Sequence, residues 1–177
     1  MNFCARNGFN KQNIVNSQEL NLKKAYNPLI DKDVVVKNDV ILDNKGNSLI
    51  ITGPNTGGKT VILKTVGLCV YLSHLGFYIP ALEESTVGFF EDVFVDVGDE
   101  QSIENNLSTF SSHMTNIINI LNKTNNKSLI LLDELCSGTD PSEGAVLSIA
   151  LLEKFKKIQF FCVVNNLMRE VHSKFQL

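Results

Sequence analysis

Apolar residues follow two different patterns along most of the chain: short continuous runs, and spacings of three and four residues. Continuous apolar runs at 49–52, 129–132 and 160–164 predict short strands, and the middle run is typical of a strand buried on both faces. Residues 61–75 are apolar enough for a helix packed on a sheet. A second helix is predicted where apolar side chains recur at intervals of three and four: Leu107, Phe110, Met114, Ile117, Ile118 and Leu121. From residue 48 the order is strand, helix, connector, helix, strand, helix, strand, which favours an α/β fold with a mainly parallel sheet flanked by helices.

The first part of the chain has no comparable periodicity of apolar residues. Residues 1–27 show no sustained period, and we interpret them as a loosely ordered lead-in segment. Two short β-rich runs follow at 34–36 and 40–42, before the turn-forming residues 43–47. We expect a small antiparallel β portion near the N-terminus. The main domain is expected to cover residues 28–177, with a C-terminal end that is incomplete.

Composition and charge narrow the class of protein. Hydrophobic residues make up 44% of the 177 residues and charged residues 20%, as in ordinary globular domains. The net charge of −3 argues against a general polyanion-binding surface. No apolar run approaches the ~20 residues of a membrane span, so no membrane partner is expected. The four cysteines form no C-x-x-C pair and no zinc pattern, which is typical of thiols in a reducing cytoplasm.

The segment after the first predicted strand has the pattern of a phosphate-binding loop. Gly53-Pro54-Asn55-Thr56-Gly57-Gly58-Lys59-Thr60 fits G-x-x-x-x-G-K-[ST] in full, between a strand and a helix. Glycines allow backbone N–H groups to surround phosphate oxygens, and a helix N-terminus adds partial positive charge. Lys59 is expected to reach the β- and γ-phosphates, and the Thr60 hydroxyl to bind Mg²⁺. The alternative is a glycine-rich turn that carries an unrelated lysine.

Two acids follow the buried run at 129–132. Asp133 is expected at the carboxyl end of that strand, where its carboxylate can hold Mg²⁺ directly or through water. Glu134 comes next and can polarise an attacking water as a general base. A strand that ends in two acids is common, and the alternative for Glu134 alone is a solvated acid or a salt-bridge partner. Together with the glycine loop, the two acids favour an ATPase.

Two further segments carry candidate polar residues. Ser108 and Thr109 stand at the start of the helix predicted from Leu107, where hydroxyls either bind an anion or simply cap the helix. Asp140 precedes Pro141 and can be the N-cap of the third helix, with Glu143 completing a capping box.

Taken together, these segments resemble a known family. The loop 53–60, the run Ser108-Thr109-Phe110, the acids 133–134 and the segment Gly138-Thr139-Asp140-Pro141 are similar to the ATPase domain of the MutS family. Thr56, Thr60 and the run 98–103 favour the bacterial branch that is linked to suppressing recombination rather than to mismatch repair. The resemblance is dense from about Asn38 to Leu152.

The resemblance implies an ABC-type ATPase that uses ATP and Mg²⁺. In that class ATP lies between two ATPase domains of a head-to-tail homodimer. One subunit offers the loop 53–60 with Asp133 and Glu134, and the other offers Ser108 and Thr109 to the γ-phosphate. Asp140 would be the acid of a segment after Glu134 that crosses the dimer interface, and the alternative is its role as a helix cap. Residues 34–36 occupy the stretch that touches adenine in the family, although three valines are more typical of a core.

Several features depart from the family. Asn166 stands where the family usually has a histidine that senses the γ-phosphate. Long clamp regions and the small nuclease domain of full-length relatives do not fit within 177 residues. DNA binding, ribosome binding and nuclease activity are therefore expected only through regions absent from this chain. The leading hypothesis is an ATPase domain of a DNA repair or recombination-control protein. The alternative is a catalytically poor nucleotide-binding fragment that acts by pairing with another ATPase domain, and a RecA-like or kinase-like phosphate-loop protein is a third.

Overall fold

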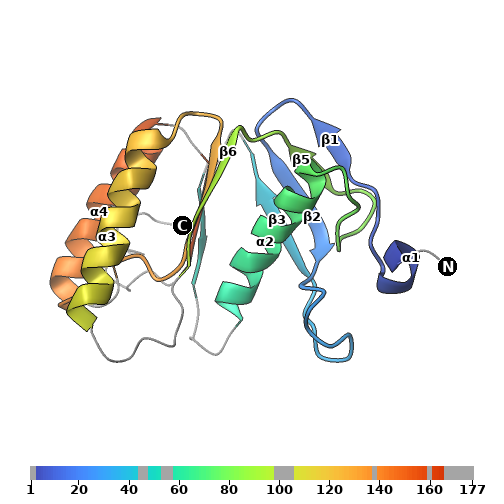
Figure 1. The fold of residues 1–177 in the computed structure, drawn as a ribbon, viewed down its shortest axis with the longest axis horizontal. Helices are drawn as coiled ribbons and strands as arrows, with labels where there is room; N and C mark the ends of the chain where they lie inside the picture. Colours follow the sequence, from blue (N-terminus) through green and yellow to red (C-terminus); the bar gives the residue numbers. More distant parts are fainter. Residues whose placement is uncertain are drawn as a thin grey trace. The chain divides into compact units, whose positions relative to one another are not determined.

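The protein is described here by a computed structural model, which describes residues 3–43, 48–52, 58–97, 106–136, 139–158 and 161–165. Its chain divides into two compact units, each with a four-stranded sheet (Figure 1). Unit 1 comprises residues 1–46 and 60–91, and unit 2 comprises residues 47–59 and 92–177. The predicted α/β class is confirmed. No helix within the described ranges is both long enough and apolar enough to cross a membrane.

Unit 1 contains a mixed sheet in the order β1-β5-β2-β3. Strand β2 (Leu20–Ala25) pairs antiparallel with both β3 (Asn38–Leu42) and β5 (Thr86–Gly88), whereas β1 (Asn13–Val15) pairs parallel with β5. The antiparallel portion near the N-terminus was predicted correctly. The short helix α1 (Phe3–Asn7) precedes β1.

The expectation of a loosely ordered lead-in over residues 1–27 is wrong for most of that segment. Residues 3–25 include α1, β1 and β2, and Leu20 and Leu22 of β2 are fully buried. A β-bulge at Lys24, whose φ is 50°, hides the strand period in the sequence because it shifts the buried face from Leu22 to Ala25. The domain boundaries that we expected remain a prediction.

The run at 34–36 was expected to form a strand in the core, and this is also wrong. The segment forms a turn followed by irregular chain, and the side chains of Val34 and Val36 are 69% and 71% exposed. The backbone N–H groups of Val34 and Val35 bond the Asp31 carbonyl instead of a neighbouring strand. Local turn formation therefore overrides the β propensity of valine here.

Helix α2 (Lys59–His74) begins at the end of the predicted phosphate loop and runs into unit 1. Its buried face combines apolar side chains and one thiol, Leu63, Val66, Cys69 and Val70, with the polar Thr65 and Ser73. Near its end, Gln12 Nε2 donates a hydrogen bond to Ser73 Oγ at 2.9 Å. Burial raises the pKa of Cys69 to about 12, because the thiolate would lose its hydration.

Unit 2 contains a fully parallel sheet in the order β4-β8-β7-β6. The strands are β4 (Ser48–Ile51), β6 (Asp92–Asp96), β7 (Ser128–Leu132) and β8 (Phe161–Asn165). All five residues of β7 are buried, as expected for a continuous apolar run in the middle of a parallel sheet. The predicted strands at 49–52, 129–132 and 160–164 are thus confirmed, whereas β5 and β6 arise within what we read as a connector.

Helices α3 (Asn106–Lys123) and α4 (Pro141–Ile158) lie side by side against the strands of unit 2 (Figure 1). Their apolar faces meet β7 and β8 in one core cluster. Ile117 and Ile120 come from α3, and Leu152 and Phe155 from α4. This packing fixes the two helices on the sheet.

Candidate functional site

The carboxyl ends of all four strands of unit 2 lie at one edge of the sheet, because the strands are parallel. Strand β4 leads from this edge into the loop 53–60, and β7 leads into Asp133 and Glu134. Strand β8 lies between them, so the two segments leave the sheet about 10 Å apart, two strand spacings. Open α/β sheets bind ligands at this edge. The topology therefore brings the end of β4, which precedes the predicted loop in the sequence, and the two acids to one side of unit 2.

The described end of the glycine loop has the features that a helix-terminal anion site needs. Gly53, Pro54, Asn55, Thr56 and Gly57 lie outside the described residues. Gly58 has a φ of 74°, a left-handed conformation that favours glycine, and Lys59 opens α2 directly after it. Lys59 is only 5% exposed, and the first turn of α2 carries no acidic residue. A buried cation thus adds its charge to the positive end of a 16-residue helix.

Asp133 supplies a buried carboxylate at the same edge. The residue is 6% exposed, and its backbone N–H donates a hydrogen bond to the Asp96 carbonyl at 2.8 Å. Among the described residues, no hydrogen-bond donor reaches the buried Asp133 Oδ1. A buried carboxylate oxygen without a donor is suited to a hard cation such as Mg²⁺.

The chain makes a strained turn immediately after Asp133. Glu134 is exposed with a φ of 50°, and the buried Cys136 has a φ of 60°. Left-handed backbone at residues other than glycine costs about 1–3 kcal/mol each and collects at functional sites. Burial raises the pKa of the Cys136 thiol, although a hydrogen bond with Ser148 opposes this shift. The turn places an exposed carboxylate next to a buried one.

No group of three or more His, Cys, Asp or Glu side chains in the described part of the chain could hold a metal ion by itself.

The structure describes the predicted helix cap at Asp140 but not the side chains of Ser108 and Thr109. Ser108 and Thr109 fall in the first turn of α3, and their side chains lie outside the described part of the structure. Asp140 caps α4, since its Oδ1 accepts a hydrogen bond from the Ser142 N–H at 2.9 Å. Bonds from the Ser142 hydroxyl and from the N–H groups of Ser142 and Glu143 lower the pKa of the Asp140 carboxyl. The cap is thus confirmed, while its place at a dimer interface stays a prediction.

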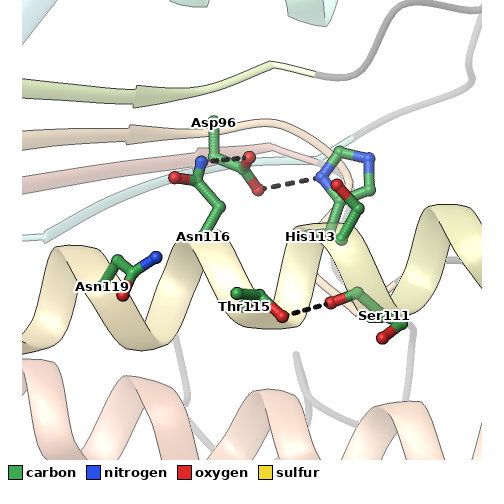
Figure 2. Close-up of a pocket in the computed structure, with 7 residues that line it drawn as sticks. Asp96, Ser111, His113, Thr115, Asn116 and Asn119 are labelled. Carbon is green, nitrogen blue, oxygen red and sulfur yellow. Dashed lines mark hydrogen bonds and ion pairs between the residues drawn. The ribbon is translucent and has the colours of Figure 1, made fainter.

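One cluster at this edge was missed by sequence reasoning. Asp96, at the end of β6, holds His113 and Asn116 of α3 through both carboxylate oxygens (Figure 2). A groove of about 640 Å³ lies beside them. The signal in the sequence was a short apolar run, Val93-Phe94-Val95, between two acids, which is typical of a strand that ends in an acid.

Comparison with known proteins gives a consistent result. Residues 49–174 match the family model described as MutS domain V. The chain is 59% identical over 140 residues to the "Endonuclease MutS2" of Pediococcus pentosaceus, covering 79% of this chain and 18% of that protein. It is 54% identical over 142 residues to the protein of the same name from Bacillus mycoides, covering 80% and 18%. It thus spans about a fifth of the length of the curated relatives it matches.

Proposed function

The chain belongs to the MutS family, and from this premise we propose that it is a Mg²⁺-dependent ATP-binding and ATP-hydrolysing domain of a DNA repair or recombination-control protein. One observation carries the proposal. The segments that follow β4 and β7 leave the same edge of one parallel sheet, where no donor from the described residues reaches the buried Asp133 Oδ1. In fold terms, we propose a phosphate-loop NTPase of the ABC-ATPase type.

The nucleotide is bound by charge and backbone donors. The amides of residues 53–58 and the N-terminus of α2 surround the phosphates, and Lys59 places its ammonium against the β- and γ-phosphate oxygens. The buried position of Lys59 supports this role, since a low-dielectric setting strengthens its attraction for an anion. The left-handed Gly58 allows the loop to join the helix without steric strain.

Mg²⁺, when bound, neutralises charge on the β- and γ-phosphates. In the proposed site Asp133 and Thr60 are its protein ligands. Glu134 accepts a proton from the attacking water, and the residue is exposed at the turn beside Asp133. The chemistry thus divides between two adjacent acids, with the buried one for the metal and the exposed one for the water.

Assembly completes the site in this proposal. We assign Ser108 and Thr109 to the γ-phosphate of a second copy, so that a homodimer encloses two nucleotides. Asp140 is a candidate at the same interface. We assign any contacts to DNA or to the ribosome to regions outside the 177 residues, and we propose no nuclease activity for this chain although its relatives carry the name endonuclease.

Thermal unfolding with and without Mg²⁺ and ATP tests the binding step. At a ligand concentration of about 100 times Kd the wild type gains about 2.7 kcal/mol of stability, or about 5–11 °C in Tm. Lys59→Ala should lose most of this gain. Lys64→Ala is the matched control, because Lys64 is exposed on the same helix. Equal gains in the wild type and Lys59→Ala would refute the assigned phosphate site.

A second candidate function is favoured by Asn166, which lies outside the described residues. Without a histidine at this position, the chain would bind ATP, hydrolyse it poorly and act by pairing with another ATPase domain. Phosphate release at rising protein concentration separates the two functions. A rate per chain that increases with concentration supports the shared-site ATPase, whereas binding without turnover at any concentration supports the pairing fragment.

A further inference from the structure

Asp96 connects two parts of unit 2 that the sequence keeps apart. It is the last residue of β6, in register with Leu132 of β7, and its carbonyl accepts the hydrogen bond from the Asp133 N–H at 2.8 Å. Its main chain is therefore attached to the start of the turn that carries Asp133 and Glu134. Its side chain is almost fully buried.

The carboxylate of Asp96 uses both oxygens to hold α3. Asp96 Oδ2 lies 3.0 Å from His113 Nδ1, and Asp96 Oδ1 accepts a hydrogen bond from Asn116 Nδ2 at 2.7 Å. Figure 2 shows the imidazole and the amide reaching from α3 toward the same carboxylate. His113 and Asn116 are three positions apart, so they share one helix face.

The two polar contacts on this face of α3 determine the orientation of the helix more closely than apolar packing does. Ile117 and Ile120 hold α3 on the core through dispersion and burial, which are not directional. The two hydrogen bonds to Asp96 are directional, and together they fix both the rotation of α3 and its position along its axis. Position 109 lies one helical turn before His113 and is therefore fixed as well.

We propose that Asp96, His113 and Asn116 form an α3 lock, a set of positioning residues that ties the first turns of α3 to the Asp133–Glu134 turn. The lock makes the metal-binding edge and the segment with Ser108 and Thr109 move as one body. The lock itself involves only residues of unit 2, whereas its expected effect on hydrolysis rests on the proposed function.

Hydrogen exchange of the nucleotide-free chain tests the structural part. His113→Ala removes one of the two bonds, so amides at 106–116 should exchange about tenfold faster or more, while those of α4 stay unchanged. His113→Asn is the rescue variant, since its side-chain amide can donate from nearly the same position as Nδ1. Asn119→Ala is the control, because Asn119 lines the same groove without bonding Asp96 in the described contacts. Equal exchange at 106–116 in His113→Ala and Asn119→Ala would overturn the lock.

Kinetics test the functional part. With the lock broken, ATP should bind at the loop 53–60 with unchanged KM, whereas kcat should fall about tenfold and recover in His113→Asn. A raised KM with unchanged kcat would overturn the positioning role, as would unchanged values of both. If the wild type itself fails to bind ATP, the proposed function fails, and the exchange experiment still decides whether the lock exists.

Discussion

Replacement of Asp133 by alanine should have opposite effects on the stability of the free chain and of the nucleotide-bound chain. The Asp133 carboxylate is buried at the sheet edge, and its Oδ1 lacks a donor among the described residues. A buried acceptor that is left unsatisfied costs about 1–3 kcal/mol of folding free energy. Asp133→Ala removes this cost and keeps the backbone bond to the Asp96 carbonyl.

The size of the effect follows from these terms. Alanine leaves a small void that offsets part of the gain, so we expect the free variant to be more stable than the wild type by about 1–2 kcal/mol. For a chain of this length that raises Tm by about 2–8 °C. At a ligand concentration of about 100 times Kd the wild type should gain about 2.7 kcal/mol from Mg²⁺ and ATP, and the variant much less. The order of the two Tm values should therefore reverse on addition of nucleotide.

Differential scanning calorimetry of both proteins, with and without Mg²⁺ and ATP, measures the four values. Asp92→Ala is the control, since Asp92 is an exposed acid on β6 and its loss should change Tm little in either condition. A free Asp133→Ala variant less stable than the wild type would mean that the carboxylate serves the fold rather than a ligand. An equal gain from nucleotide in both proteins would exclude Asp133 from the site.

Three further predictions concern catalysis and the capping of α4. Glu134→Gln should keep ATP affinity, slow hydrolysis and accumulate an ATP-held dimer in light scattering; a persistent monomer with undiminished turnover would exclude the shared site. Asn166→His should raise single-turnover hydrolysis by roughly 10²–10³-fold with little change in affinity, because one donor to developing charge is restored; an unchanged rate would mean that this position does not limit the chemistry. Asp140→Asn should preserve the cap at pH 7 and also below the carboxyl range, whereas the wild-type cap should weaken as pH falls through the lowered pKa of Asp140, which thermal unfolding against pH would reveal.

The long apolar elements could be predicted because their periods are uninterrupted. Helix α3 keeps its spacing of three and four over most of its 18 residues, and β7 is a single apolar run between polar neighbours. Strand β2 could not be predicted in this way, since the bulge at Lys24 breaks the alternation of Leu20 and Leu22. The valines at 34–36 misled the prediction because β propensity reports packing partners that this segment lacks in the described structure.

In the candidate site, too, contiguous motifs could be predicted from the sequence and contacts between distant residues could not. The glycine loop and the two acids are contiguous motifs, so their candidate chemistry can be recognised from the sequence alone. In the α3 lock, His113 and Asn116 lie 17 and 20 positions after Asp96 in the sequence. Only the parallel pairing of β6 with β7 brings Asp96 to the edge of the sheet where Asp133 lies. Strain at Glu134 and Cys136 was likewise invisible, because neither residue type signals a left-handed backbone.

Calorimetric titration of the chain with ATP in the presence of Mg²⁺ tests the central claim most directly. The account predicts saturable binding of one nucleotide per chain, weakened strongly by EDTA and by Lys59→Ala, and retained in Lys64→Ala. Heats that are absent in the wild type, or identical in the wild type and Lys59→Ala, would contradict the claim that the edge of the unit 2 sheet binds a magnesium nucleotide.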